Sequence, residues 1–230
     1  MSGKLFVVAT PIGNLGDITF RAVETLKIVD FVICEDTRVT KILLDHFEIS
    51  KPLFVINAHN ESKSLGKVLE RLSTGETCAL VSDAGTPCIS DPGIRLVNKI
   101  ISEGIEVCGI PGANAAILSL SISGLPTDSF IFEGFLPQKK GRQKKLLQLA
   151  EEERTIVLYE STYRIKKLIE ELNEYMPERE IVVFRELTKK FEESWRGKAN
   201  ELLVDFDKKI TKGEFVVVIS AKNWIKHIMQ

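Results

Sequence analysis

Cysteine and histidine are scarce in this chain of 230 residues, and neither forms a metal-binding spacing. The four cysteines contain no C-x-x-C pair, and the histidines His46, His59 and His227 are scattered. A structural zinc site needs clustered thiol and imidazole ligands, so we expect no metal. Since three cysteines lie in apolar stretches, we expect free thiols in a reducing compartment.

The chain also lacks a long hydrophobic run and an excess of either charge. The apolar stretch near the N-terminus is too short for a signal peptide or a membrane span, so we expect a cytoplasmic protein without membrane contact. The formal net charge is −1, which excludes a globally basic protein. Any contact with nucleic acid must therefore come from a local patch.

Two phosphate-binding patterns are missing as well. The first loop reads ATPIGNLG, so Ala9 stands where the dinucleotide fingerprint G-x-G-x-x-G needs its first glycine. The pattern G-x-x-x-x-G-K-[ST] does not occur. We therefore expect a nucleoside-like ligand without a pyrophosphate.

Short apolar strands alternate with amphipathic helices in the first half of the chain. The expected strands are Leu5–Thr10, Phe31–Cys34, Leu53–Ile56, Thr77–Val81 and Glu106–Ile110. The expected helices are one capped by Asp17, then Val39–Phe47, Glu61–Leu72, Ile94–Ile101 and Ala115–Ile122. This alternation predicts an α/β fold with a mostly parallel sheet covered on both faces.

Gly124-Leu125-Pro126 interrupts the alternation, which predicts two α/β domains, residues 1–125 and 126–230. The expected strands of the second domain are Phe130–Glu133, Thr155–Tyr159, Glu180–Arg185 and Phe215–Ser220, with Glu192–Arg196 as a further candidate. Its expected helices lie near Arg142–Glu152, Tyr163–Tyr175 and Ala199–Asp207.

Polar segments with glycine or proline follow four strands of the first domain, namely TPIGN, CEDTR, SDAGTP and PGAN. Ligands of open α/β sheets bind outside the carboxyl ends of the strands, where these segments should meet. One such loop alone is better explained as a turn of the chain, so the prediction depends on all four. Asp83 could pair with an ammonium group, and Gly85 permits close approach of backbone to a ligand.

Eight runs resemble the tetrapyrrole methylase superfamily and, more narrowly, the ribosomal RNA small-subunit methyltransferase I family. They are VATPIGNLGDIT (Val8–Thr19), CEDTR (Cys34–Arg38), SDAGTPCISDPG (Ser82–Gly93), PGANAA (Pro111–Ala116), GLPTDSFIFEGFLP (Gly124–Pro137), YESTYR (Tyr159–Arg164), RELTK (Arg185–Lys189) and GEFVVVI (Gly213–Ile219). The resemblance covers nearly the whole chain in order, and CEDTR and SDAGTP are specific to the narrower family.

The resemblance implies methyl transfer from S-adenosylmethionine to the ribose 2′-hydroxyl of a cytidine in 16S rRNA, near the decoding centre of the small ribosomal subunit. It implies a cofactor in the cleft between two domains, and a homodimer. Members commonly continue beyond the point that corresponds to Gln230, and we expect the cleft to be complete without that extension. The implied cofactor contacts are Ile12, Asp83, Gly85, Ile89, Ser90, Asn114, Ala115, Leu136, Leu158, Tyr159 and Phe184.

Charged residues in the same runs are candidates for the acceptor side of the cleft. Arg38, Glu160 and Lys189 are the predicted catalytic residues, although the sequence does not choose the general base. A lysine acts as a base only if burial or nearby cations depress its pKa, and a surface ion pair is the alternative for each residue. The run KKGRQKK predicts an RNA-binding patch, with a solvated start of a helix as the alternative. Its cationic residues are Lys139, Lys140, Arg142, Lys144 and Lys145.

Two other functions remain open on the sequence. A methyltransferase acting on a small tetrapyrrole-like acid would not need KKGRQKK, and it would favour G-x-G-P-G in the first loop, where this chain has ATPIG. A non-catalytic RNA-binding protein with the same fold would not need so many motifs around one cleft.

Overall fold

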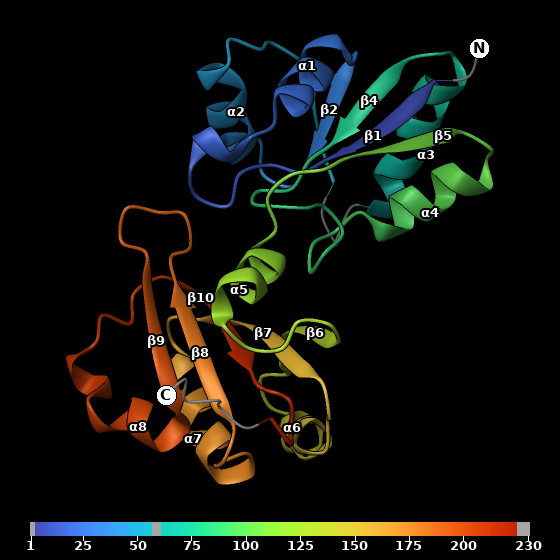
Figure 1. Ribbon diagram of the computed structural model, residues 1–230. Coiled ribbons are helices and arrows are strands. Elements are labelled where there is room, and N and C mark those ends of the chain that lie inside the picture. Colours follow the sequence, from blue (N-terminus) through green and yellow to red (C-terminus); the bar gives the residue numbers. More distant parts are fainter. Residues whose placement is uncertain (1–2, 57–60, 225–230) are drawn as a thin grey trace. The chain divides into compact units, whose positions relative to one another are not determined.

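The chain forms two compact units, residues 1–114 and 115–230, and a computed structural model describes residues 3–56 and 61–224 (Figure 1). The division falls before helix α5 (Ala115–Ser123), whereas the sequence predicted it after that helix. The difference arises because α5 packs on β7 (Thr155–Ser161) and β10 (Glu214–Ile219) of the second unit.

The first unit is built on a parallel sheet, as predicted. Its strands are β1 (Lys4–Val8), β2 (Phe31–Cys34), β3 (Leu53–Val55), β4 (Thr77–Leu80) and β5 (Glu106–Ile110). They lie in the order β3-β2-β4-β1-β5, and all four neighbouring pairs are parallel (Figure 1). The carboxyl ends of all five strands therefore meet at one edge of the sheet.

Helices cover both faces of this sheet. They are α1 (Phe20–Ile28), α2 (Thr37–His46), α3 (Glu61–Ser73) and α4 (Ile94–Ser102), with a short 3-10 turn, η1, at Leu15–Asp17. Alternate strand residues enter separate cores, so Leu5 packs with α3 and α4 whereas Val8 packs with α1 and α2. The predicted cap of α1 was wrong: Asp17 ends η1, and the Thr19 hydroxyl accepts the N–H of Ala22 at 3.1 Å.

The second unit has a mixed sheet in the order β6-β7-β10-β8-β9. The strands not yet located are β6 (Phe130–Phe135), β8 (Glu180–Arg185) and β9 (Glu193–Lys198). Strands β6 and β7 are parallel, and the other three pairs are antiparallel. The ends of β6, β7 and β8 and the start of β10 consequently share one edge of the sheet.

The main core of the second unit lies under three helices, α6 (Arg142–Ala150), α7 (Ile165–Tyr175) and α8 (Ala199–Val204). A 3-10 turn, η2, follows at Phe206–Lys208 and contributes Phe206 to that core. Helix α5 contacts β7 and β10, and the amide N–H of Ala116 donates to the Tyr159 hydroxyl at 3.2 Å. No helix within residues 3–56 and 61–224 is long and apolar enough to cross a membrane.

Candidate functional site

The loops after β1 and β4 are joined by backbone hydrogen bonds at the carboxyl edge of the first sheet. The N–H of Thr10 donates to the carbonyl of Gly85 at 2.9 Å, and the N–H of Gly85 donates to the carbonyl of Thr10 at 3.1 Å. The Thr10 hydroxyl also donates to the Ser82 carbonyl at 3.1 Å. These hydrogen bonds hold the TPIGN loop and the SDAGTP loop together.

The other two predicted loops attach to the same structure. The Thr86 hydroxyl donates to the carbonyl of Ala113 in the PGAN loop at 3.1 Å. From the CEDTR loop, the N–H of Asp36 donates to a carboxylate oxygen of Asp83 at 3.2 Å. The predicted convergence of four loops on one edge is thus confirmed.

Strained backbone is concentrated in the segment Ser82–Gly93. Cys88 and Ser90 have φ values of 69° and 66°, a left-handed region that non-glycine residues rarely adopt. Gly85 has a φ of +83°, and a Cβ there would lie 3.1 Å from Ile12 Cγ2. Such strain persists only where surrounding contacts enforce it, and it is frequent at binding sites. Ile89, between the two strained residues, keeps 40% of its surface exposed.

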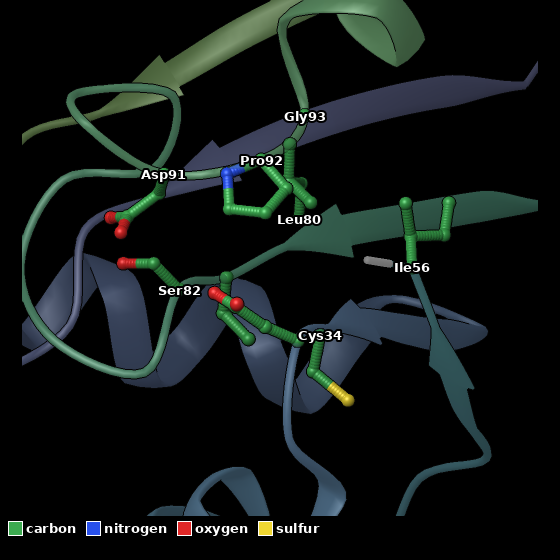
Figure 2. A pocket seen from close by; sticks show the side chains of 9 residues that line it. Cys34, Ile56, Leu80, Ser82, Asp91, Pro92 and Gly93 are labelled. Carbon is green, nitrogen blue, oxygen red and sulfur yellow. The ribbon is translucent and has the colours of Figure 1, made fainter. Parts of the chain in front are cut away.

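Two carboxylate residues, Glu35 and Asp91, line a small pocket beside these loops together with Ser82 and mostly apolar residues. Figure 2 shows the Asp91 carboxylate directed toward the Ser82 hydroxyl. Burial, reinforced by the negative charge of Glu35, raises the pKa of Asp91 to about 6. Burial and the charge of Asp83 likewise raise the pKa of Glu35. The sequence reading did not single out Asp91, whose only signal was its place in the SDPG turn.

Arg38, a predicted catalytic residue, is fixed by its neighbour Asp36. The guanidinium donates Nε–H to Asp36 Oδ1 at 3.0 Å, and its side chain remains 88% exposed. This contact, together with the N–H of Arg38, lowers the pKa of Asp36 to about 2. Asp36 also caps α2, since its carboxylate accepts the N–H of Arg38 at 2.8 Å. The catalytic role of Arg38 stays a prediction.

In the second unit, the predicted cofactor residues divide between the two faces of the sheet. Tyr159 and Phe184 are both in register with Val216 of β10, so they share one face, the face of α5. Leu158 is fully buried in the core beneath α6 and α7, and Leu136 is 3% exposed in the same core. Both side chains point into this core rather than toward α5, and the contact of Leu136 and Leu158 with the cofactor stays a prediction.

Glu160 was predicted to line the acceptor side, and this interpretation was wrong. Its side chain is fully buried on the α6 and α7 face. One carboxylate oxygen, Oε1, accepts the N–H of Ser161 at 2.7 Å and pairs with Arg164 Nε at 2.8 Å. The other oxygen, Oε2, has no hydrogen bond among the described residues and lies 3.8 Å from Arg142 Nη2.

Lys189 does not have the lowered pKa that a general base would need. Burial alone would lower the pKa of Lys189, but hydrogen bonds to Glu214 and Glu186 outweigh that effect and raise it. The ammonium lies 2.7 Å from Glu214 Oε2 and 3.0 Å from Glu186 Oε1. In this arrangement Lys189 is a cation held by two carboxylates.

The lysine segment, defined here as residues 139–145, is only partly a surface patch. Lys139, Lys140 and Lys144 are exposed, whereas Lys145 is half-buried and pairs with Glu133 at 2.7 Å. Arg142, which the sequence predicted to bind RNA, is 4% exposed and forms a bidentate pair with a carboxylate of α7, so its side chain is not part of the exposed patch. No group of acidic, cysteine or histidine side chains in the described part of the chain could hold a metal ion.

Comparison with known proteins identifies the class to which this fold and site belong. The family model described as Tetrapyrrole (Corrin/Porphyrin) Methylases matches residues 4–203, so the chain belongs to that family. A crystal structure of uroporphyrin-III C-methyl transferase from Thermus thermophilus, complexed with S-adenyl homocysteine, shares the fold. It superposes with a TM-score of 0.65 at 18% identity, covering 95% of this chain and 97% of that chain.

Two curated relatives narrow the class to the family of ribosomal RNA small subunit methyltransferase I. The protein of that name from Thermotoga maritima is 46% identical over 220 residues, covering 96% of this chain and 99% of that protein. The one from Synechocystis sp. is 50% identical over 220 residues, covering 95% of this chain and 79% of that protein.

Proposed function

We propose that this protein transfers a methyl group from S-adenosylmethionine to a ribose 2′-hydroxyl of 16S rRNA, with a cytidine near the decoding centre as the target. Identity of 46% and 50% to proteins named Ribosomal RNA small subunit methyltransferase I carries this proposal. The small-molecule alternative is not favoured, because the tetrapyrrole enzyme with the same fold is only 18% identical.

The joined loops of the first unit suit S-adenosylmethionine by shape and by charge. Backbone approaches closely at Gly85, and the nearby carboxylates of Asp83 and Glu35 favour a ligand with an ammonium and a sulfonium. We assign the cofactor to Ile12, Asp83, Gly85, Ile89 and Ser90, and to Asn114, Ala115, Tyr159 and Phe184 beyond them. A cleft between the two units as its location remains part of the proposal.

Methyl transfer needs an activated donor, an aligned acceptor oxygen and a group that takes up the acceptor's proton. Bound S-adenosylmethionine supplies a methyl group already activated on sulfur, so no metal is required. The joined loops would hold the donor in one orientation and exclude water, so that an incoming hydroxyl oxygen would be aligned for attack. In the transfer the methyl–sulfur bond would break as the new C–O bond forms, S-adenosylhomocysteine would leave, and the 2′-hydroxyl would lose its proton to a base. The raised pKa of Lys189 argues against this residue as the base that takes the proton.

The RNA partner is the small ribosomal subunit, and the proposed contacts to its phosphates are Lys139, Lys140 and Lys144. These three ammonium groups are exposed and form no ion pair with another described residue. A homodimer, which the resemblance implies, and a cytoplasmic location complete the proposal. Sedimentation at micromolar concentration tests the dimer.

A methyl-transfer assay tests the function directly. Purified protein is incubated with small ribosomal subunits that lack the modification, labelled S-adenosylmethionine and excess chelator. We expect label on a single ribose 2′-oxygen of 16S rRNA and none on a uroporphyrinogen substrate. Label on the tetrapyrrole alone would support the alternative, and binding of subunits without any transfer would indicate a non-catalytic RNA-binding protein.

A further inference from the structure

Arg142 and Arg164 bind opposite oxygens of one buried carboxylate, that of Glu160. Arg164 Nε lies 2.8 Å from Glu160 Oε1, and Arg142 Nη2 lies 3.8 Å from Glu160 Oε2. Arg142 also pairs with Glu171 at 2.6 Å and donates to the Pro137 carbonyl at 3.1 Å. Negative and positive side chains therefore alternate from Glu171 on α7 through Arg142 on α6 to Glu160 at the end of β7. These ion pairs connect the lysine segment to Arg164.

Arg164 differs from Arg142 because one edge of its guanidinium has no hydrogen-bond partner among the described residues. Its Nε pairs with Glu160 and donates to the Ser161 hydroxyl at 3.1 Å. Within the described residues, its two Nη nitrogens have no hydrogen-bond partner, and the side chain is 24% exposed. The Glu160 carboxylate contacts Nε and orients the guanidinium, while the two Nη groups stay open. Two parallel N–H donors of this kind match a phosphate in geometry and charge.

An exposed aromatic ring lies beside this fork. The centre of the Phe135 ring is 6.0 Å from Arg164 Cζ, and Phe135 is 53% exposed. Phe135 ends β6, and the lysine segment begins a few residues later, so cations and an aromatic face occur together. Exposed aromatic faces next to cationic side chains are the usual means of binding single-stranded RNA.

We propose that Arg164 binds a backbone phosphate of the RNA, and that Glu160 and Arg142 are positioning residues that hold Arg164 beside the lysine segment. This inference rests on the proposed function, since it names a contact to the same RNA. Glu160 thereby has a role although it is buried, and Arg142 acts from within the lysine segment without touching RNA.

Salt-dependent binding tests the phosphate contact. Wild type, Arg164→Gln, Arg164→Lys and the control Lys166→Gln are titrated with a single-stranded oligoribonucleotide over a salt series. Lys166 lies on α7, and its ammonium pairs with Asp207 at 2.7 Å. Lys166→Gln removes one positive charge, as Arg164→Gln does, so it controls for the change in net charge. Losing one phosphate contact on single-stranded RNA should reduce the salt slope by about 0.7 in Arg164→Gln. Arg164→Lys should keep the slope, and the control should match wild type.

Kinetics on unmodified small ribosomal subunits tests the positioning role. We expect Arg164→Gln to raise KM for subunits roughly tenfold with kcat within about twofold, because one charge-assisted contact is lost. Glu160→Gln should also raise KM while retaining the wild-type salt slope, because the Arg164 charge remains but is no longer oriented. Calorimetric affinity for S-adenosylmethionine should be unchanged in every variant.

Three outcomes would overturn the inference. They are a wild-type salt slope in Arg164→Gln, the same slope change in Lys166→Gln, and weakened cofactor binding in Arg164→Gln. If Glu160→Gln fails to fold, the two Arg164 variants still decide the phosphate contact. If wild type transfers no methyl to small subunits, the proposed function fails, while the oligoribonucleotide slopes still decide whether Arg164 binds phosphate.

Discussion

The two units organise their sheet edges by different physical means. In the first unit, backbone hydrogen bonds such as those between Thr10 and Gly85 hold the loops together, and the charged side chains nearby are mostly acidic. In the second unit, buried ion pairs around Arg142 and Glu160 hold the edge, and Lys139, Lys140 and Lys144 of the lysine segment are exposed. Backbone contacts suit close approach to a small cationic ligand, whereas fixed cations suit a polyanion.

The largest effect should come from breaking the ion-pair network of the second unit. Arg142→Ala removes the bidentate partner of the half-buried Glu171 and leaves the buried Glu160 with Arg164 as its partner, so we expect a loss of about 3 kcal/mol in the free energy of unfolding. The control Lys144→Ala, exposed on the same helix, should change it by less than about 0.5 kcal/mol. Urea unfolding measures both, and equal stability of the two variants would mean that the network is not structural.

Breaking the backbone-joined edge of the first unit should remove cofactor binding. At Gly85 the φ of +83° disfavours any side chain, and the space beside Ile12 is filled, so Gly85→Trp should weaken binding of S-adenosylmethionine at least about 100-fold. Asp83→Ala should weaken it as well.

The control for Gly85 is Gly104, which also has a positive φ, +71°, but has no atom within 4 Å of a Cβ. Gly104→Ala should bind normally in calorimetry with chelator present. If Gly85→Trp binds as well as Gly104→Ala, the cofactor lies elsewhere.

Neutralising the exposed lysines tests whether the second unit binds the polyanion while the first unit binds the cationic cofactor. Lys139→Gln, Lys140→Gln and Lys144→Gln together should reduce affinity for small subunits roughly tenfold and flatten the salt dependence of binding. Cofactor affinity should not change, because these lysines belong to the RNA side. Unaltered methylation by the triple variant across a salt series would show that the segment is only a solvated start of a helix.

The smallest effect concerns pH and the acidic pocket of the first unit. Since burial raises the pKa of Asp91 from 3.8 to about 6, Asp91 contributes stability that is present below pH 3.8 and lost as the pH rises through 6. In Asp91→Asn this loss is absent. After a discount for solvent screening, we expect wild type to lose roughly 1 kcal/mol relative to the variant between pH 4 and 7. Urea unfolding at several pH values measures it, and parallel curves would contradict the assignment.

Patterns local in the chain predicted most of the fold. Apolar runs of four to six residues located the strands of the first sheet, and the loops after them converge as parallel strands require. The boundary between the units was displaced by one helix, because the pattern of α5 does not show which sheet it packs on. Glu214 and Glu186, which hold Lys189 protonated, are likewise distant in sequence from each other.

The amino-acid sequence by itself determined the family, the alternation of strands and helices, and the loops that meet at the first sheet edge. Each of these depends on residue types within a short window, or on the fixed geometry of parallel strands. Only the tertiary structure decided that Arg142 is buried while Lys144 is exposed, and that Glu160 faces a core. The reason is that Glu171, which pairs with Arg142, lies 29 positions further along the chain, and burial depends on such distant partners.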